Sequence, residues 1–446
     1  MPIAVHFIEL SYILMMVFFL FFYNKKGLPL VEGAFLLLII CSPYSISIIP
    51  FRQDTYELYG LYSNTKILNL MNFYKFAGLS ILDIFAILVI LKNFNSALYI
   101  PHFFKVFYLS IILLSVIAYT FSSLTMWAPE LDSVTRALSV LKSIVYIVSV
   151  YCVIERSCRR MGMSAFFRML ANIIFIYCFV NAILLNFLPA WYTWVKYSFN
   201  YLFLDQTDQF IVFLYCVLVF WGPQSNQGRF KIYAFLLIML LAISGGKGGV
   251  YSLLILFFSW CYQRMQASSA SLGGMFICIV LLSWILSYII GLYELDISIY
   301  TRYFQVKQLL INYENNLLLM LFGLGPAKAY LFYSQPAIFD PGAYTTEELS
   351  SNFKLAFQMP YLSWLKNFGI LGGVMLFISL NFVVRTALRF RHIAIFSPAI
   401  IYALGLYFVM VGFMDFPSFG LKTIIPISLY IYMVKCNMIS YNKEVQ

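Results

Sequence analysis

The chain has 446 residues, of which 62% are hydrophobic, 19% aromatic and only 11% charged, whereas about 25% are charged in a typical soluble domain. This composition excludes a soluble globular protein and predicts an all-α, polytopic integral membrane protein. A β-barrel is excluded because its strands alternate apolar and polar residues. The net charge of +11 is not taken as a sign of nucleic-acid binding, since Lys and Arg near span ends set membrane topology.

A membrane-crossing helix needs about 20 mainly apolar residues, and about 13 such spans (12 to 14) are expected here. The range reflects the short pair beside Gly245, which can form one long span, and the tight turn at Asp415 between the last two. No linker, repeat or soluble domain is visible, so residues 1–446 are expected to form one membrane domain. The spans lie near residues 7–23, 29–50, 77–92, 103–125, 137–154, 165–188, 208–222, 232–246, 249–263, 272–293, 360–384, 394–415 and 418–434.

Basic residues occupy alternate loops, which predicts the orientation of the chain because cytoplasmic loops hold the excess of Lys and Arg. With Lys25 and Lys26 inside, the N-terminus lies outside, the C-terminus inside and the long loop 294–359 outside. In a bacterium with two membranes that outer face is the periplasm. The residues expected inside are Lys92, Lys105, Arg156, Arg159, Arg160, Arg168, Arg229, Lys231, Arg264, Arg385, Arg389, Arg391 and Lys435.

The eight cysteines and three histidines are scattered along the chain. None has the spacing of metal ligands, and the long loop has no cysteine, so neither a metal site nor a disulfide framework is expected. Three carboxylates, Glu32, Asp83 and Asp415, lie within or beside apolar runs, where a charge costs about 2.5–3.5 kcal/mol at mid-bilayer. Asp83 lies most clearly inside a span, and it favours a transporter with a proton or ion site as a rival hypothesis.

The turn at residues 244–249, with the sequence SGGKGG, joins two spans on the outer side. Gly246 and Gly248 let the backbone approach a ligand, and amides at the start of a helix favour an anion. Lys247 in that setting suits a phosphate. The alternative is an ordinary tight turn whose lysine extends to the membrane interface. The turn is not a P-loop, because the G-x-x-x-x-G-K-[ST] spacing is absent.

The long loop opens with DISIYTR at residues 296–302. The Arg302 guanidinium is placed where it can bind a diphosphate through two parallel hydrogen bonds. The alternative is an ion pair with Asp296 or Glu294 that fixes the loop. An amphipathic helix follows and is expected to lie along the membrane surface. Its apolar residues are Phe304, Leu309, Leu310 and Leu317.

The rest of the loop supplies an FGLGP turn at residues 322–326, expected to be architectural, and three candidate bases, Asp340, Glu347 and Glu348. A carboxylate near an apolar face has a raised pKa that suits removal of a proton from a sugar hydroxyl. An exposed pair such as Glu347 and Glu348 can equally well be merely solvated.

The loop ends in QMPYLSWLKNFGILGG at residues 358–373. Gln358, Tyr361 and Trp364 suit a sugar, whose ring faces stack on aromatic side chains. Tyrosine and tryptophan also anchor proteins at the membrane interface, so both interpretations stay open. Gly372 and Gly373 permit close helix packing.

In their order, SGGKGG, DISIYTR, FGLGP and QMPYLSWLKNFGILGG resemble the O-antigen polymerase and ligase superfamily of lipid-linked polysaccharide enzymes. The resemblance covers residues 243–373, and two positions depart from the family pattern. Lys247 stands where the family usually has arginine, a change that keeps the charge but not the geometry. Gln358 and Met359 stand where ligases are expected to have His-Asn. Glutamine cannot act as a base, so a polymerase fits better than a ligase.

The resemblance implies a membrane glycosyltransferase that joins undecaprenyl-diphosphate-linked repeat units at the periplasmic face of the bacterial inner membrane, without nucleotide sugar, metal or other cofactor. Lys247 and Arg302 would stabilise the departing diphosphate, with Glu347 and Glu348 as candidate bases. The expected partners are the lipid-linked oligosaccharide, membrane lipids, a chain-length regulator and a flippase. The alternatives are an O-antigen ligase and a flippase or other transporter. A transporter would predict symmetric halves, and no repeat is visible.

Overall fold

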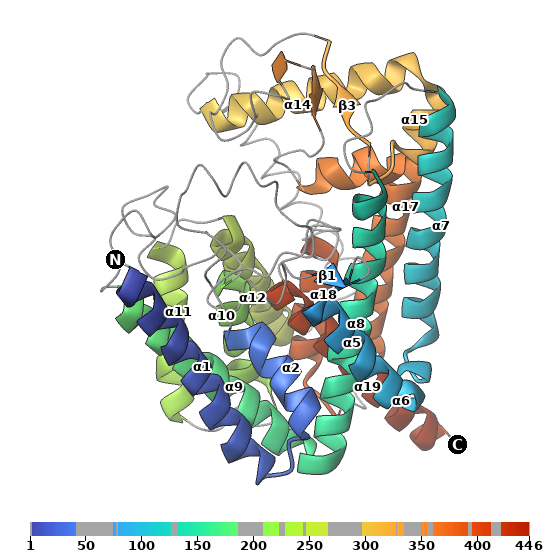
Figure 1. Cartoon of the computed structure of the whole chain (residues 1–446). Coiled ribbons are helices and arrows are strands. Elements are labelled where there is room, and N and C mark those ends of the chain that lie inside the picture. Colours follow the sequence, from blue (N-terminus) through green and yellow to red (C-terminus); the bar gives the residue numbers. More distant parts are fainter. Residues whose placement is uncertain are drawn as a thin grey trace.

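The computed structural model describes residues 2–41, 75–76, 79–125, 133–185, 208–222, 228–243, 247–265, 297–326, 328–333, 349–350, 352–354, 360–390, 395–411 and 421–445. These residues are almost all helical, and the helices form one bundle with a smaller group across one end (Figure 1). The helices are α1 (Pro2–Asn24), α2 (Leu30–Cys41), α5 (Ile81–Lys92), α6 (Phe94–Leu98), α7 (His102–Thr125), α8 (Ser133–Met161), α9 (Met163–Leu185), α10 (Asp208–Trp221), α11 (Gly228–Ile243), α12 (Lys247–Met265), α14 (Ile297–Asn315), α15 (Leu317–Phe322), α17 (Pro360–Arg389), α18 (Pro398–Met410) and α19 (Leu421–Val445).

Two short antiparallel strand pairs complete the described structure. β1 (Lys75–Phe76) pairs with β2 (Leu79–Ser80), and β3 (Tyr330–Leu331) pairs with β4 (Phe353–Lys354). In the second pair Tyr330 is opposite Lys354.

The predicted all-α membrane protein is confirmed. Among the described residues, four helices are long and apolar enough to cross a membrane, namely His102–Ser122 of α7, Met163–Val180 of α9, Leu362–Arg389 of α17 and Lys422–Ser440 of α19. A helix is present in every predicted span except 272–293, which lies outside the described residues. α11 ends at Ile243 and α12 begins at Lys247, so the pair beside Gly245 forms two helices and not one long span.

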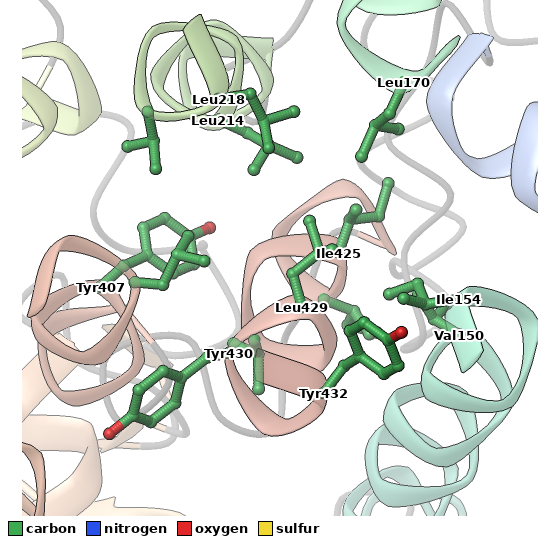
Figure 2. Close-up of a cluster of buried hydrophobic side chains, with 14 of the residues drawn as sticks. Val150, Ile154, Leu170, Leu214, Leu218, Tyr407, Ile425, Leu429, Tyr430 and Tyr432 are labelled. Atoms are coloured by element: carbon green, nitrogen blue, oxygen red, sulfur yellow. The ribbon is translucent and has the colours of Figure 1, made fainter. Parts of the chain in front are cut away.

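α18 and α19 form the interior of the bundle. Every residue of α18 from Ala399 to Met410 is buried, as expected for a helix that is apolar on all sides. In Figure 2, Ile425 and Leu429 of α19 lie among side chains from α8, α9 and α10. By contrast α7 is peripheral, and its exposed apolar stripe is Val106, Leu109, Leu113 and Val116.

A buried carboxylate joins three elements at one end of the bundle. Glu32, near the start of α2, is fully buried. It lies 3.3 Å from both Lys92 Nζ, at the end of α5, and Arg156 Nε in α8. Asn93 Nδ2 donates to the same carboxylate at 3.1 Å. Both oxygens of Glu32 therefore have partners, which offsets the cost of burying the charge.

A second buried carboxylate, Glu155, directly precedes Arg156 in α8 and joins α8 to α19. Glu155 accepts hydrogen bonds from Arg159 and from Lys435 of α19, the latter at 2.5 Å. Lys92, Arg156, Arg159 and Lys435 were all predicted to lie on one side of the membrane, and the structure gathers them at one end. We call it the basic end. The loop that contains α14 lies at the opposite end of the bundle (Figure 1).

Candidate functional site

The polar loop forms a compact unit of its own. We call residues 297–326, 328–333 and 352–354 the loop module. Its main helix, α14, lies crosswise to α7 and α17, while α15 rests on the ends of both (Figure 1). Phe121 of α7 stacks on Phe322 of α15 with ring centroids 5.1 Å apart. The module is therefore packed on the bundle and does not extend away from it.

α17 is broken at Gly369, where φ is 58° and ψ is −152°. Residues 360–368 run crosswise beneath α15, and the rest of α17 runs alongside α7 (Figure 1). The 20 residues from Ile370 to Arg389 extend about 30 Å, which matches the hydrocarbon thickness of a bilayer. Residues 360–368 of the predicted span 360–384 pack with the loop module and are separated from the rest of α17 by the break.

The break exposes helix carbonyls that the loop module satisfies. Three successive carbonyls just before Gly369 each accept one hydrogen bond from the module. The pairs are Tyr313 Oη to Leu365 O at 2.6 Å, Leu324 N to Lys366 O at 2.7 Å, and Gly325 N to Asn367 O at 3.0 Å. Carbonyls at a helix end need such partners, and each bond contributes about 0.5–1.5 kcal/mol. Burial raises the pKa of Tyr313, which keeps its hydroxyl a donor.

Two glycines make this contact possible. A Cβ on Gly323 would lie 2.4 Å from Phe368 N, and a Cβ on Gly369 would lie 2.5 Å from Met320 O. Both glycines have positive φ, a region that other residues rarely adopt. The backbones of α15 and α17 interlock here, so the FGLGP turn is architectural, as predicted.

Trp364 holds the bend of α17 from inside. The side chain is 1% exposed, and its Nε1 donates to Gly372 O across the break at 2.8 Å. A Cβ on Gly372 would lie 2.9 Å from the same nitrogen, so the small residue makes room for the indole. Contact of Trp364 with a sugar stays a prediction, and it would require the ring to leave this position.

α14 buries a polar face. Asn312 Nδ2 donates to Leu331 O at 2.7 Å, and Gln308 Oε1 accepts from Tyr333 N at 2.8 Å. Side-chain amides of α14 thus bind the extended segment that includes β3. The buried polar residues recur at intervals of four, three and four, and they are Thr301, Gln305, Gln308 and Asn312.

The apolar residues of α14 and α15 divide between two faces. Phe304 and Leu309 are buried inside the loop module, so the expectation that they face the membrane is wrong. Tyr303, Leu310 and Leu317 are 51%, 54% and 66% exposed. Tyr303 and Leu310 are seven residues apart and therefore lie on one side of α14, whereas Leu317 begins α15. This narrower stripe can contact lipid.

Two lysines are buried where the module meets the bundle. Lys366 is 1% exposed, and its Nζ donates to Lys328 O at 2.7 Å. Lys328 is 4% exposed, and its Nζ lies 5.6 Å from the centre of the Tyr119 ring. Within the described part of the chain, that ammonium has neither a hydrogen-bond acceptor nor a carboxylate partner. A cation–π contact supplies about 0.5–2 kcal/mol, whereas burial of an ammonium costs several kcal/mol.

The structure gives the backbone, but not the side chains, of four predicted site residues. Lys247 and Gly248 begin α12, Arg302 lies in the first half of α14, and Tyr361 lies in the crosswise part of α17. The other predicted residues, Gly246, Asp340, Glu347, Glu348 and Gln358, lie outside the described residues.

The direction of α12 bears on Lys247. Tyr262 Oη, near the end of α12, donates to Ala387 O, near the end of α17, at 3.0 Å. Since these two ends meet, α12 begins toward the side of the bundle that carries the loop module. Whether Lys247 and Arg302 converge on one ligand stays a prediction.

Neither protein-family models, nor curated proteins, nor solved structures match this chain. What the site can do is therefore set by its own residues. Among the side chains that the structure describes, no group of three or more His, Cys, Asp or Glu residues is placed to hold a metal ion. The described part of the site offers the side chains of two buried lysines, Lys328 and Lys366, and an ammonium group suits an anion.

Asp83, the basis of the transporter hypothesis, is held by other residues. Its Oδ2 accepts from Ser80 N at 2.9 Å and from Lys142 Nζ at 2.6 Å. Its Oδ1 accepts from Tyr146 Oη at 2.9 Å. Asp83 thus caps α5 and joins it to α8, so its burial has a structural explanation.

The lysines of the site were missed at the sequence level. Lys328 follows a turn, and Lys366 lies in a polar and aromatic segment, so neither stands out by hydropathy. The sequence offered only a weak sign of their role. Lys328 lies two residues after the FGLGP turn, and Lys366 lies near the end of the loop.

Proposed function

We propose that this protein is a membrane glycosyltransferase of the O-antigen polymerase type. It joins undecaprenyl-diphosphate-linked oligosaccharide units at the periplasmic face of a bacterial inner membrane. It crosses that membrane about 13 times, and residues 294–359 form its periplasmic loop. Its partners are the lipid-linked substrate, membrane lipids, a flippase and a chain-length regulator.

One observation carries the proposal: the loop module is locked onto a broken helix at the end of the bundle remote from the basic end. Three hydrogen bonds and two interlocked glycines hold it there. Fixed cations and dipoles stabilise developing charge most effectively when they need no rearrangement. An exposed apolar stripe on the same module suits a substrate with a lipid tail.

The reaction follows from the chemistry of the substrate. A sugar hydroxyl of the incoming unit attacks the anomeric carbon of the growing chain, whose bond to the lipid diphosphate breaks. Lys247 and Arg302 stabilise the negative charge of the leaving diphosphate. Glu347, Glu348 or Asp340 accepts the hydroxyl proton. Gly246 and Gly248 allow close approach of the phosphate, and Gln358, Tyr361 and Trp364 bind sugar.

Two other functions are weaker candidates. An O-antigen ligase is expected to have a His-Asn pair where this chain has Gln358 and Met359. A flippase or other transporter is less favoured because both oxygens of Asp83 are occupied by structural partners.

The test compares Lys247→Ala and Arg302→Ala with Lys307→Ala, an exposed lysine of α14, in the parent strain. Surface polysaccharide is separated on gels and membrane levels of each variant are measured. We expect the first two to leave a lipid A core with a single repeat unit, and Lys307→Ala to keep long chains. Long chains at normal abundance in Lys247→Ala and Arg302→Ala would refute their roles. A bare core would favour a ligase.

A further inference from the structure

We propose that the Lys328 ammonium binds a phosphate group of the lipid-linked substrate. The inference rests on the proposed function. It adds to the proposed site a third cationic residue, which lies outside the motifs found in the sequence. Lys328 lies where the FGLGP turn, α7 and the broken part of α17 meet. It is therefore inside the fixed junction that holds the loop module to the bundle.

The backbone of Lys328 is held while its ammonium is not. Leu324 N and Gly325 N bond to α17 just before the residue, and Tyr330 pairs with Lys354 just after it. The carbonyl of Lys328 itself accepts from Lys366 Nζ at 2.7 Å. Among the described residues, only the Tyr119 ring faces its Nζ, at 5.6 Å. The described residues thus orient the Lys328 ammonium and accept none of its hydrogen bonds.

The surroundings of Lys328 are positive and polar. Lys366, itself 1% exposed, donates its Nζ to the carbonyl of Lys328 and so adds a second positive side chain at this junction. The next residue, Asn367, is 3% exposed, and its Oδ1 has no hydrogen-bond partner among the described residues. Buried polar groups normally have partners. A phosphate with an attached sugar supplies both an anion and a hydroxyl donor.

The competing explanation is that Lys328 is a structural residue that packs on Tyr119. A single cation–π contact returns less free energy than burial of an ammonium costs. If the contact with the Tyr119 ring were the role of the ammonium, Lys328→Met would lose that contact and unfold more easily. If the ammonium is kept for a ligand, a methionine of similar length removes the cost of burial without loss of stability. The two explanations therefore predict opposite changes in stability for Lys328→Met.

The experiment uses the purified full-length protein in detergent, with Lys328→Met and the exposed control Lys307→Met. Thermal unfolding and equilibrium binding are measured with farnesyl diphosphate, a short lipid diphosphate, and with inorganic pyrophosphate. We expect Lys328→Met to unfold at the same or a higher temperature than the parent without ligand. We expect it to bind farnesyl diphosphate at least tenfold more weakly and to lose the ligand-induced rise in Tm. Lys307→Met should keep both.

The proposal is overturned if Lys328→Met does not fold, or unfolds at a lower temperature without ligand, because the ammonium is then structural. It is also overturned if the parent protein does not bind farnesyl diphosphate, or if Lys328→Met binds it as tightly as the parent. Pyrophosphate binding that needs Lys328 supports the anion site and shows that the phosphate alone is recognised. Binding of farnesyl diphosphate alone shows that the lipid is required.

These outcomes are separable from failure of the proposed function. If binding needs Lys328 but Lys247→Ala and Arg302→Ala both keep long polysaccharide, the anion site stands and the polymerase assignment falls. If Lys328→Met binds normally while those two variants lose polymerisation, only the role of Lys328 is lost.

Discussion

At the residue scale, the contact between α15 and α17 depends on two glycines, Gly323 and Gly369, because a side chain at either position would collide with the other helix. Gly323 combines φ of 78° with ψ of 179°, a conformation that is essentially limited to glycine. A Cβ there would also meet the backbone of α17. Gly373, in the helical part of α17 after the break, would with an added Cβ meet only Leu365 Cδ2 at 3.7 Å. Gly323 and Gly373 therefore form a matched pair for substitution.

We predict that Gly323→Ala destabilises the protein by about 1–3 kcal/mol from backbone strain alone, and by more if α15 separates from α17. Gly373→Ala is expected to be neutral or to stabilise by about 0.5–1 kcal/mol, because alanine suits a helix better than glycine. Thermal unfolding of the purified proteins checks both. Equal losses of stability in the two variants would contradict the interlocked backbone.

The buried lysines show a limit of residue-level prediction. Lys247 stands out in the sequence because glycines flank it, and Arg302 stands out because it ends the segment DISIYTR, which begins with an aspartate. Lys328 and Lys366 meet only because the FGLGP turn folds onto the break in α17. A chemical motif that is assembled by tertiary contact leaves no spacing in the chain to detect.

At the element scale, α5 and α8 are linked by a mostly buried ion pair. Lys142 Nζ lies 2.6 Å from Asp83 Oδ2, and both side chains are mostly buried. Removal of one partner from a buried pair costs about 3–5 kcal/mol, because the other charge is left uncompensated. Replacement of both partners by neutral residues is often nearly neutral.

We predict that Asp83→Asn and Lys142→Met each lower the free energy of unfolding, and that the double variant recovers most of the loss. Unfolding of the three variants forms a double-mutant cycle, and surface polysaccharide is a second measurement. A structural pair predicts that the double variant is both stable and active. A stable but inactive double variant would instead indicate that Asp83 carries a proton or an ion, as in a transporter.

The positions of the helices could largely be predicted from the sequence. The break in α17 and the buried face of α14 could not. Apolar runs long enough to span a bilayer must form helices there, since unpaired backbone groups are costly in lipid. The segment NFGILGG contains three glycines, and the one that breaks α17 is the one that meets α15. Likewise Leu309 was expected to face lipid, but it packs against Leu319, Leu324 and Tyr330.

At the scale of the whole molecule, the two ends of the bundle differ in chemistry. The basic end has ion pairs around Glu32 and Glu155. The opposite end has the loop module. Cytoplasmic loops are enriched in Lys and Arg, so the basic end is expected to face the cytoplasm.

We predict that Lys307→Cys reacts with a membrane-impermeant maleimide when it is added to cells with a permeable outer membrane. Lys26→Cys should react only after the inner membrane is opened. Both lysines are exposed, one in α14 and one beside α1, so access should depend on the side of the membrane. A cysteine-free background provides the control. Reaction of Lys26→Cys before the inner membrane is opened would show that the predicted orientation is wrong.

The break in α17 also bears on how deep in the membrane the two buried lysines lie. We expect the membrane-crossing part of α17 to begin after the break at Gly369, and Lys366, three residues before the break, is bonded to Lys328. The Lys366 ammonium is then expected close to the plane where hydrocarbon gives way to lipid headgroups. A lipid-borne diphosphate diffusing laterally would reach the protein at that height with its tail still in the bilayer. The protein and its substrate would then meet by diffusion within the membrane plane, and the rate of encounter would depend on the density of the lipid-linked substrate in that leaflet.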